Sequence, residues 1–430
     1  MEYKTLLRRG AAGICCLLLC GTCACTFQEE ESSAPTLPVT TTTETTTETT
    51  TTTTAVTTAT AIYKQDAAGT LSPADLLQDI LNKATQQYGG AGMQVAVIAD
   101  GRVAATASCG WAEKQVAAMI DTTLLRIASP SKTVVSMVAH CLIDRGLMTL
   151  DDDISQHLGY TVRHPSYPDT PITVRMLMAH TSALADNPHY LTTPEDLQAY
   201  LTGGGVFTGY APGARFVYNN FAYGVLGTVC EYAGGASFHD LAQQYLFEPM
   251  GITASFLAES VPDQQLAVLY TAGGGVGLSK AAHRGLATYH TAPGYTMRCY
   301  AGGLIISAAD YARLLTLMMN DGVYEGQTIL SADAVASMHS VQFNRGAIRQ
   351  CLPMWRRDKM YGQTPLYYHT GSAYGVYSLY VYNPTDRNGV VIVTTGSSGK
   401  RDGNAVYAVC SYVVQAVYDA GISLFGDTLV

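Results

Sequence analysis

The chain has 430 residues, of which 47% are hydrophobic and 14% charged, with a formal net charge of −9 at pH 7. This acidic balance disfavours a nucleic acid or another polyanion as a partner, because binding phosphates requires a basic face. The length allows two or three average domains, or one large enzyme domain with a sizeable core. Eleven cysteines suggest a disulfide scaffold, but five of them lie in the first 25 residues, so the count describes two different segments.

The N-terminus has the pattern of an export signal. Lys4, Arg8 and Arg9 precede an apolar stretch that runs from Ala11 to Cys25. Fifteen helical residues rise only about 22 Å, short of the ~30 Å hydrocarbon core, so residues 1–25 are interpreted as a signal peptide rather than a membrane span. Two forms stay open: a cleaved secretory signal, or a lipoprotein signal that is acylated at Cys25. Either form predicts a protein that is secreted or anchored at the bacterial cell surface.

A Thr-rich segment follows the signal. From Thr40 to Thr60, 16 of 21 residues are Thr, and such a composition has too little apolar surface to offset the entropy of the chain. Residues 26–70 are therefore predicted to be a disordered linker, acting as a tether or stalk, although low-complexity drift without a role would give the same composition. The folded part is expected to begin near Leu71 and to form one domain over residues 71–430.

The first elements of this domain are a β-hairpin and a helix. Residues 93–99 and 102–109 are expected strands, because apolar residues flank the turn signal Asp100-Gly101. A helix is predicted over residues 129–147, with an apolar side and Gly146 near its end. The middle of the chain, from 151 to 288, is long, rich in loops and partly helical.

The C-terminal part returns to a β-rich pattern. A helix is expected over residues 308–319, and β-rich runs cover residues 375–382 and 390–395. The last helix begins near Val406 and has valines and a cysteine at helical spacing. Strands at both ends of the domain and helices between them predict an α+β fold, in which one sheet is built from the two chain ends around a helical insertion.

A Ser-x-x-Lys motif opens the helix at 129–147. Ser129 and Lys132 are three residues apart and share a face of the helix, so the ammonium group can lie beside the hydroxyl. A serine is a weak nucleophile until a neighbouring base takes its proton, and a lysine with a lowered pKa can be that base. The positive end of the helix would also stabilise an oxyanion. A helix-capping serine with a surface lysine one turn later explains the same pattern without chemistry.

Two further polar motifs follow. Tyr218-Asn219-Asn220 precedes an apolar run; its phenol could relay a proton beside a lysine, and an amide could bind a substrate amide. His369-Thr370-Gly371 leads into Ser372 and a β-rich run. The glycine permits close backbone approach, and the strand could bind an acyl group, with His369 supplying positive charge or a hydrogen-bond donor. Taken singly, both motifs are equally compatible with ordinary structural positions.

The order of the three motifs resembles that of the penicillin-recognising serine enzymes. The flanking residues sharpen this resemblance. The segments that match family landmarks are Arg126-Ile127-Ala128-Ser129-Pro130-Ser131-Lys132-Thr133, Gly146-Leu147-Met148-Thr149-Leu150-Asp151-Asp152, Ile172-Thr173-Val174-Arg175, Met178-Ala179-His180-Thr181-Ser182 and Ala301-Gly302-Gly303-Leu304 before Ala309-Asp310. The likeness covers residues 75 to 420, and it is to the class C β-lactamase-related family, which includes DD-carboxypeptidases, esterases and D-amino-acid peptidases.

The resemblance implies the fold and the roles of the site residues. It implies a β-lactamase/transpeptidase-like fold, with an antiparallel β-sheet flanked by helices. Ser129 would be the acylated nucleophile, with Lys132 and Tyr218 jointly its activating pair. The substrate-binding residues would be Asn220, His369, Thr370, Gly371 and Ser372. The main-chain N–H groups of Ser129 and Ser372 would form the oxyanion hole.

Two positions depart from the family pattern. His369 stands where many β-lactamases have Lys, which removes a constant cation. The family's DD-carboxypeptidases and esterases often have His here, so the resemblance favours a DD-carboxypeptidase, D-peptidase or esterase over a β-lactamase. Ala183 replaces the usual Gly after His180-Thr181-Ser182, which puts the local turn in doubt, while His180 itself is interpreted as structural.

No cofactor or metal is expected, since the chain has no HExxH motif and no paired His/Asp spacing. The six later cysteines have no motif spacing, and one or two bridges at most are expected. The expected partners are a small peptide, ester or β-lactam substrate and, through it, peptidoglycan. Contact with a membrane is expected only in the lipoprotein form, through its lipid anchor. The hypotheses are an exported serine hydrolase, a β-lactamase, and a catalytically silent module that binds cell-wall peptides.

Overall fold

The structure, a computed structural model, describes residues 71–187, 193–295 and 297–426. The signal predicted for residues 1–25 and the linker predicted for residues 26–70 lie outside these residues. Within the described part of the chain, no helix has the length and apolar character that crossing a bilayer requires.

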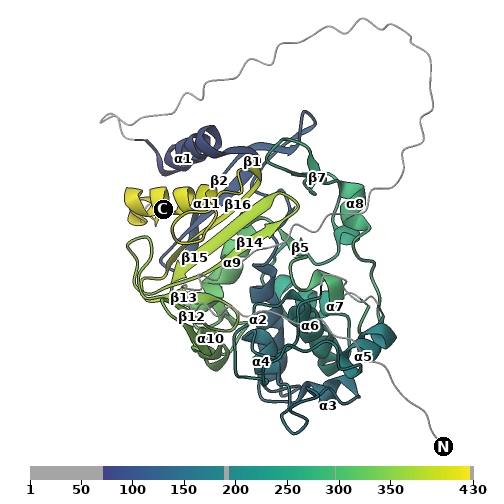
Figure 1. Cartoon of the computed structure of the whole chain (residues 1–430). Helices are drawn as coiled ribbons and strands as arrows, with labels where there is room; N and C mark the ends of the chain where they lie inside the picture. The colour runs from purple at the N-terminus through teal and green to yellow at the C-terminus, as the bar shows by residue number, and fades with distance from the viewer. Residues whose placement is uncertain (1–70, 188–192, 296, 427–430) are drawn as a thin grey trace, which may run out of the picture. The chain divides into compact units, whose positions relative to one another are not determined.

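A nine-stranded antiparallel sheet forms the centre of the described residues (Figure 1). Its strands, in spatial order, are β11 (Phe343–Arg345), β12 (Ile348–Gln350), β13 (Trp355–Arg357), β14 (Leu366–Ala373), β15 (Val376–Asn383), β16 (Asn388–Ser397), β1 (Gly89–Ala99), β2 (Arg102–Glu113) and β3 (Ala117–Ala118). The early strand β1 pairs with the late strand β16, with Met93 opposite Thr394. The prediction of one sheet built from both chain ends is therefore confirmed.

The predicted hairpin between β1 and β2 is present, and both strands are longer than expected. Asp100 and Gly101 adopt φ values of 52° and 73°, and two consecutive positive φ angles are typical of the two-residue turn that suits the twist of a hairpin. All ten residues of β16 are buried, as are most of β1. The two strands thus lie at the middle of the sheet with both faces covered.

The remaining short strands lie outside the large sheet. They are β4 (Leu125–Arg126), β8 (Ile305–Ile306) and β5 (Ala254–Ser255), which pair with one another, together with β6 (Leu269–Tyr270), β7 (Val276–Leu278), β9 (Val323–Tyr324) and β10 (Gln327–Thr328). The three-stranded sheet matters most for the site, because β4 leads directly into Ser129.

Helices cover both faces of the large sheet (Figure 1). The α-helices are α1 (Pro73–Tyr88), α2 (Ser131–Asp144), α3 (Ile154–Leu158), α4 (Val174–Met178), α5 (Pro194–Thr202), α6 (Asn220–Gly234), α7 (Phe238–Ala242), α8 (Lys280–Arg284), α9 (Ala308–Thr316), α10 (Ala332–His339), α11 (Ala408–Ala420) and α12 (Ser423–Gly426). Single turns of other helix types cover Gln243–Phe247, Ala258–Ser260, Met297–Cys299 and Leu317–Met319. α1 and α11 share one apolar cluster with the sheet, whereas α2, α6 and α9 share a larger cluster with its other face.

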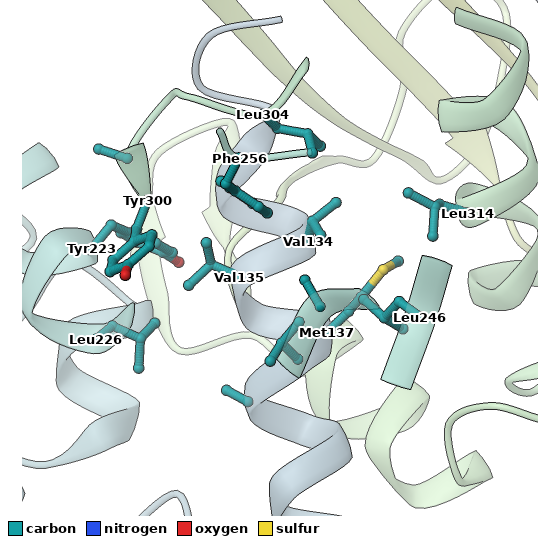
Figure 2. Close-up of a cluster of buried hydrophobic side chains, with 14 of the residues drawn as sticks. Val134, Val135, Met137, Tyr223, Leu226, Leu246, Phe256, Tyr300, Leu304 and Leu314 are labelled. Atoms are coloured by element: carbon teal, nitrogen blue, oxygen red, sulfur yellow. The ribbon is translucent and has the colours of Figure 1, made fainter. Parts of the chain in front are cut away.

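Helix α2 lies at the centre of the larger cluster. All residues from Ser131 to Leu142 are buried, so α2 is enclosed on all sides rather than on the one apolar side expected from the sequence. Figure 2 shows Val134, Val135 and Met137 of α2 among side chains from other elements. The helix begins two residues later than predicted, so Ser129 precedes it, and Pro130 is its N-cap residue.

Gly227 on α6 lies against Tyr300, which provides a test of this packing. A Cβ at Gly227 would lie 2.0 Å from the Tyr300 ring, and that ring is fully buried, with its hydroxyl donating to Glu231 Oε1 at 2.6 Å. We expect Gly227→Ala to lower the free energy of unfolding by about 2 to 3 kcal/mol through overpacking, as measured by urea denaturation. Gly205→Ala is the control, since nothing lies within 4 Å of its Cβ. Equal stability of the two variants would contradict this account of the packing.

Candidate active site

Ser129 lies in a tight turn between β4 and α2. The residue before it, Ala128, has φ 57°, a left-handed conformation that costs a non-glycine residue energy and persists only when its surroundings enforce it. Ser131 enforces it here, because its Oγ donates to Ala128 O at 2.6 Å and accepts from Leu304 N at 3.0 Å. The turn thus holds the half-buried Ser129 side chain in one place at the start of α2.

Lys132 lies one turn further on and has no exposed surface. Its Nζ donates to Ala301 O at 2.7 Å, to Asn220 Oδ1 at 2.8 Å and to Ser129 Oγ at 3.2 Å. Burying a charge is costly unless hydrogen bonds replace water, and these three oxygens do so. The structure therefore places Lys132 beside Ser129, and not on the surface as the non-catalytic interpretation of the motif requires.

Tyr218 completes the group around Ser129. Its hydroxyl donates to Ser129 Oγ at 3.0 Å, and Lys132 Nζ lies 5.0 Å from the centre of its ring. The ring of His180 packs on the tyrosine at a centroid distance of 4.5 Å. Ser129, Lys132 and Tyr218, predicted from positions up to 89 residues apart, are therefore brought together.

His180 contacts both Tyr218 and the residue that follows it. It is fully buried, and its Nδ1 accepts the backbone N–H of Asn219 at 3.1 Å. Burial and, next, the nearby Lys132 hold the pKa of His180 well below its ordinary value, so the ring is neutral. Ala183, three residues later, adopts φ 63°. The turn in which the family has Gly is thus formed with Ala in the left-handed region.

Asn220 is oriented by a residue that the sequence analysis did not identify, Asp186. The side chain of Asp186 accepts from Asn220 N at 2.9 Å, from Phe221 N at 2.8 Å and from Asn220 Nδ2 at 3.2 Å. The carboxylate thereby caps the start of α6. Both ends of the Asn220 amide are engaged within the protein, so the predicted contact to a substrate amide would have to use the second Nδ2 hydrogen.

Strand β14 approaches the Ser129 turn through Gly371. A Cβ at this position would lie 2.6 Å from Ile127 O and 2.6 Å from Pro130 Cδ. Ser378, opposite Gly371 on β15, donates from its Oγ to Ile127 O at 2.6 Å. Gly371 was expected to let the backbone of a ligand approach the strand. In the structure it lets the protein's own Ser129 turn pack against the strand.

The edge of β14 is open beside the site. β13 pairs with β14 only from Leu366 to Tyr368, and among the described residues no strand covers that edge from Thr370 onward. Thr370 is half-buried and Ser372 is exposed. An open strand edge has backbone groups that a peptide-like substrate can pair with.

His369 differs from its neighbours on β14 because it is fully buried. Its ring stacks on Trp355 at 4.7 Å with an interplanar angle of 12°, and its Nδ1 donates to Thr370 O at 2.7 Å. Burial and then the charge of Lys132 lower the pKa of His369 to about 3. The positive charge considered for His369 from the sequence is therefore absent at neutral pH, and the ring supports the wall of the site.

Three contributors to the site were missed by sequence reasoning. Ala301 belongs to the Ala-Gly-Gly-Leu landmark, which predicts no role for this residue by itself, and its carbonyl accepts a hydrogen bond from Lys132 Nζ. Asp186 and Trp355 carried no motif signal of their own. Each acts through a residue that is distant in the sequence, so only the folded chain reveals it.

The described residues contain neither a cluster suited to a metal ion nor a disulfide. No group of three or more His, Cys, Asp or Glu side chains that could hold a metal ion occurs among the described residues. The six cysteines in the same part of the chain form no disulfide, and five of them are buried. Burial raises the pKa of Cys141 to about 12, so this thiol is protonated and unreactive.

Comparison with known proteins identifies the family. The Beta-lactamase family model matches residues 74–409. The chain belongs to the beta-lactamase family. Membership confirms the resemblance drawn from the motifs, and it places the protein among the serine hydrolases of this fold.

Individual relatives and structures agree with this assignment. The D-alanyl-D-alanine-carboxypeptidase/endopeptidase AmpH of Escherichia coli K12 is 28% identical over 221 residues, which cover 48% of this chain and 56% of AmpH, little more than half its length. An octameric penicillin-binding protein homologue from Pyrococcus abyssi superposes with a TM-score of 0.65 at 20% identity, covering 80% of this chain and 77% of that one. The D-alanine carboxypeptidase AmpC from Burkholderia cenocepacia gives 0.62 at 21%, covering 79% and 97%. These two structures support the predicted fold.

The close approach at Gly371 leads to a prediction about reactivity. Gly371→Ala would place a methyl group against the backbone of Ile127 and displace the Ser129 turn from β14. We expect labelling of Ser129 by a fluorophosphonate probe to slow at least tenfold, with the circular dichroism spectrum unchanged. Gly403→Ala, at an open surface position, is the control. Labelling of Gly371→Ala at the rate of the unmodified protein would refute the role given to this contact.

The buried histidines predict how stability depends on pH. Burial, with smaller contributions from nearby cations, lowers the pKa of His369 and His283 to about 3 and that of His339 to about 4. Below pH 6.5 these histidines bind protons in the unfolded chain but stay neutral in the folded protein. The free energy of unfolding therefore falls as the pH falls. The expected slope is on the order of 1 kcal/mol per pH unit for each ring, measured by urea denaturation between pH 7.5 and 5. His339→Gln should reduce that slope; a stability that is flat over this range would contradict the prediction.

Proposed function

We propose that this protein is an exported serine hydrolase that forms an acyl-enzyme at Ser129. The observation that carries the proposal is the position of Ser129 Oγ, 3.2 Å from Lys132 Nζ and 3.0 Å from the Tyr218 hydroxyl. A nucleophilic oxygen held between a buried amine and a phenol is the arrangement that acyl transfer through serine requires.

The proposed reaction has two steps. In the first, Ser129 Oγ attacks the substrate carbonyl while its proton passes to the pair of Lys132 and Tyr218. The carbon–nitrogen or carbon–oxygen bond to the leaving group then breaks, and the leaving group takes the proton from that pair. In the second, water attacks the ester carbonyl on Ser129 and gives its proton to the same pair. The bond between the carbonyl carbon and Ser129 Oγ then breaks, Oγ takes that proton back, and the acid product leaves.

The strand beside the site suggests how the acyl group is held. We assign the main-chain N–H groups of Ser129 and Ser372 to the oxyanion, and the open edge of β14 at Thr370 and Gly371 to the backbone of the substrate. The short distance from Gly371 to the Ser129 turn supports this assignment, because it brings both N–H donors to one region. Asn220 lies at the other side of Lys132 and would contact the substrate amide through its Nδ2.

The proposed substrates are peptides that end in a D-amino acid, which would make the enzyme a DD-carboxypeptidase or D-peptidase, or small esters. Two observations support this choice over a β-lactam. AmpH, which matches about half of this chain, is named a D-alanyl-D-alanine carboxypeptidase, and His369 supplies no positive charge at neutral pH where many β-lactamases have Lys. Peptidoglycan would then be the source of the substrate.

Export is part of the same proposal. The charged and apolar segments of residues 1–25 and the Thr-rich segment of residues 26–70 are what a secreted or lipid-anchored enzyme on a tether would have. A site at the cell surface or outside the cell would give the enzyme access to peptidoglycan. Mass analysis of the mature N-terminus distinguishes a cleaved signal from an acylated Cys25.

Labelling with an active-site probe tests the covalent mechanism. We expect a fluorophosphonate or a penicillin to form one adduct at Ser129, identified by peptide mass spectrometry, because Lys132 and Tyr218 activate that oxygen. Ser129→Ala should abolish the adduct, and Tyr218→Phe should slow its formation at least tenfold. Ser131→Ala is not a suitable control, since Ser131 holds the turn; Ser372→Thr keeps the backbone N–H and should still be labelled.

A panel of substrates then separates the candidate activities. D-Ala-D-Ala peptide, p-nitrophenyl acetate and nitrocefin report carboxypeptidase, esterase and β-lactamase activity, respectively. Turnover of the peptide or the ester that vanishes in Ser129→Ala supports the proposal. Fast turnover of nitrocefin alone would instead assign a β-lactamase. No adduct and no turnover would indicate a catalytically silent module that binds cell-wall peptides.

A further inference from the structure

Asp186 links the start of α6 to the buried lysine. Its carboxylate accepts the backbone N–H groups of Asn220 and Phe221 and also the side-chain Nδ2 of Asn220, at 3.2 Å. On the opposite end of the same amide, Asn220 Oδ1 accepts from Lys132 Nζ at 2.8 Å. A continuous chain of hydrogen bonds thus runs from Asp186 through Asn220 to Lys132 and on to Ser129.

This chain can form with only one orientation of the Asn220 amide. An ionised carboxylate has no proton to donate, so the NH₂ group must face Asp186. A lysine ammonium has no lone pair to accept a hydrogen bond, so Oδ1 faces Lys132. Only a neutral lysine could accept a hydrogen bond from a reversed amide. Without the carboxylate, the two ends of the amide could exchange places, because they have nearly the same shape.

The orientation of the amide decides what Lys132 can do to Ser129. Ala301 O and Asn220 Oδ1 can only accept hydrogen bonds, whereas Ser129 Oγ can both accept and donate. When Lys132 is neutral, its two N–H groups satisfy the two oxygens that can only accept. Ser129 is then, of these three partners, the one that can give a proton to the lone pair of the amine.

We propose that Asp186 is a positioning residue that fixes the Asn220 amide and thereby directs the lone pair of Lys132 toward the proton of Ser129. Lys132 is then the member of the pair that takes the serine proton, and Tyr218, whose hydroxyl donates to Ser129 Oγ at 3.0 Å, is the member that stabilises the developing charge on that oxygen. With the amide reversed, Nδ2 would donate to the same lone pair and occupy it.

This inference rests on the proposed acyl-enzyme mechanism, so its test needs one readout that does not depend on turnover. Asp186→Asn keeps the size of the side chain but supplies a donor, which permits the reversed amide. The control is Asp75→Asn, which alters a first-turn carboxylate of α1, a helix that packs on the sheet face away from α2. Asp186→Glu restores an acceptor and should recover part of the lost reactivity.

The first measurement is the rate of Ser129 labelling by a fluorophosphonate from pH 5 to pH 10. We expect Asp186→Asn to lower the maximal rate at least tenfold and to move the acidic limb of the profile to lower pH by half a unit or more, because Lys132 loses an oxygen acceptor and a nearby negative charge that both favour its protonated form. Asp75→Asn should match the unmodified protein in rate and in profile.

The second measurement follows Lys132 directly by NMR of protein labelled with ¹³C-lysine. The chain has eight lysines, and the Lys132 signal is identified by its loss in Lys132→Arg. We expect the midpoint of its titration to be lower in Asp186→Asn than in the unmodified protein.

The outcomes distinguish a failure of the positioning role of Asp186 from a failure of the acyl-enzyme mechanism. A tenfold slower labelling with the pH limb and the lysine midpoint both unchanged would mean that Asp186 only caps α6, and it would overturn the positioning role. Full reactivity of Asp186→Asn would overturn it as well. If the unmodified protein is not labelled at all, the acyl-enzyme proposal fails, and the lysine midpoint alone then decides whether Asp186 acts on Lys132 through Asn220.

Discussion

Lys132 is an ionisable side chain with no exposed surface. Oxygen atoms of the protein around Ser129 provide the hydrogen bonds that its ammonium group would otherwise make to water. The oxygens that surround its Nζ come from the turn before α2, from the start of α6 and from the Ala301 loop before β8. An unpaired buried amine would destabilise the fold by several kcal/mol. The contact between these three segments therefore stabilises the helical region, and the same contact brings together the residues of the site.

The sheet constrains the opposite side of the same turn. Ser378 binds Ile127 O, and Tyr311 of α9 donates from its hydroxyl to Pro130 O at 2.9 Å. With Gly371 in contact with the same segment, these hydrogen bonds hold Ala128 in its left-handed conformation. Ser129, the proposed nucleophile, is thus fixed between the β-sheet and the helices. The helices bring Lys132 beside it, and the sheet presents the open strand edge that we propose for the substrate.

His369 shows that a motif residue does not by itself define an electrostatic environment. A histidine in this position could carry a charge near neutral pH if it faced water. Here burial, the ring of Trp355 and the proximity of Lys132 keep it neutral. A positive charge beside a substrate carboxylate would have to come from another side chain, and the strand contributes backbone groups and shape rather than a cation.

The sequence by itself determined the parts of this protein that depend on neighbours in the chain. The spacing of Ser129 and Lys132 and the Asp100-Gly101 hairpin follow from local backbone geometry, and the order of the motifs identified the fold family. The start of α2 after Ser129, the burial of His369 and the partnership of Asp186 with Asn220 were decided by the tertiary structure. The reason is physical: a turn or a helical spacing depends on residues a few positions apart, whereas charge state and amide orientation depend on groups that only the folded chain brings together.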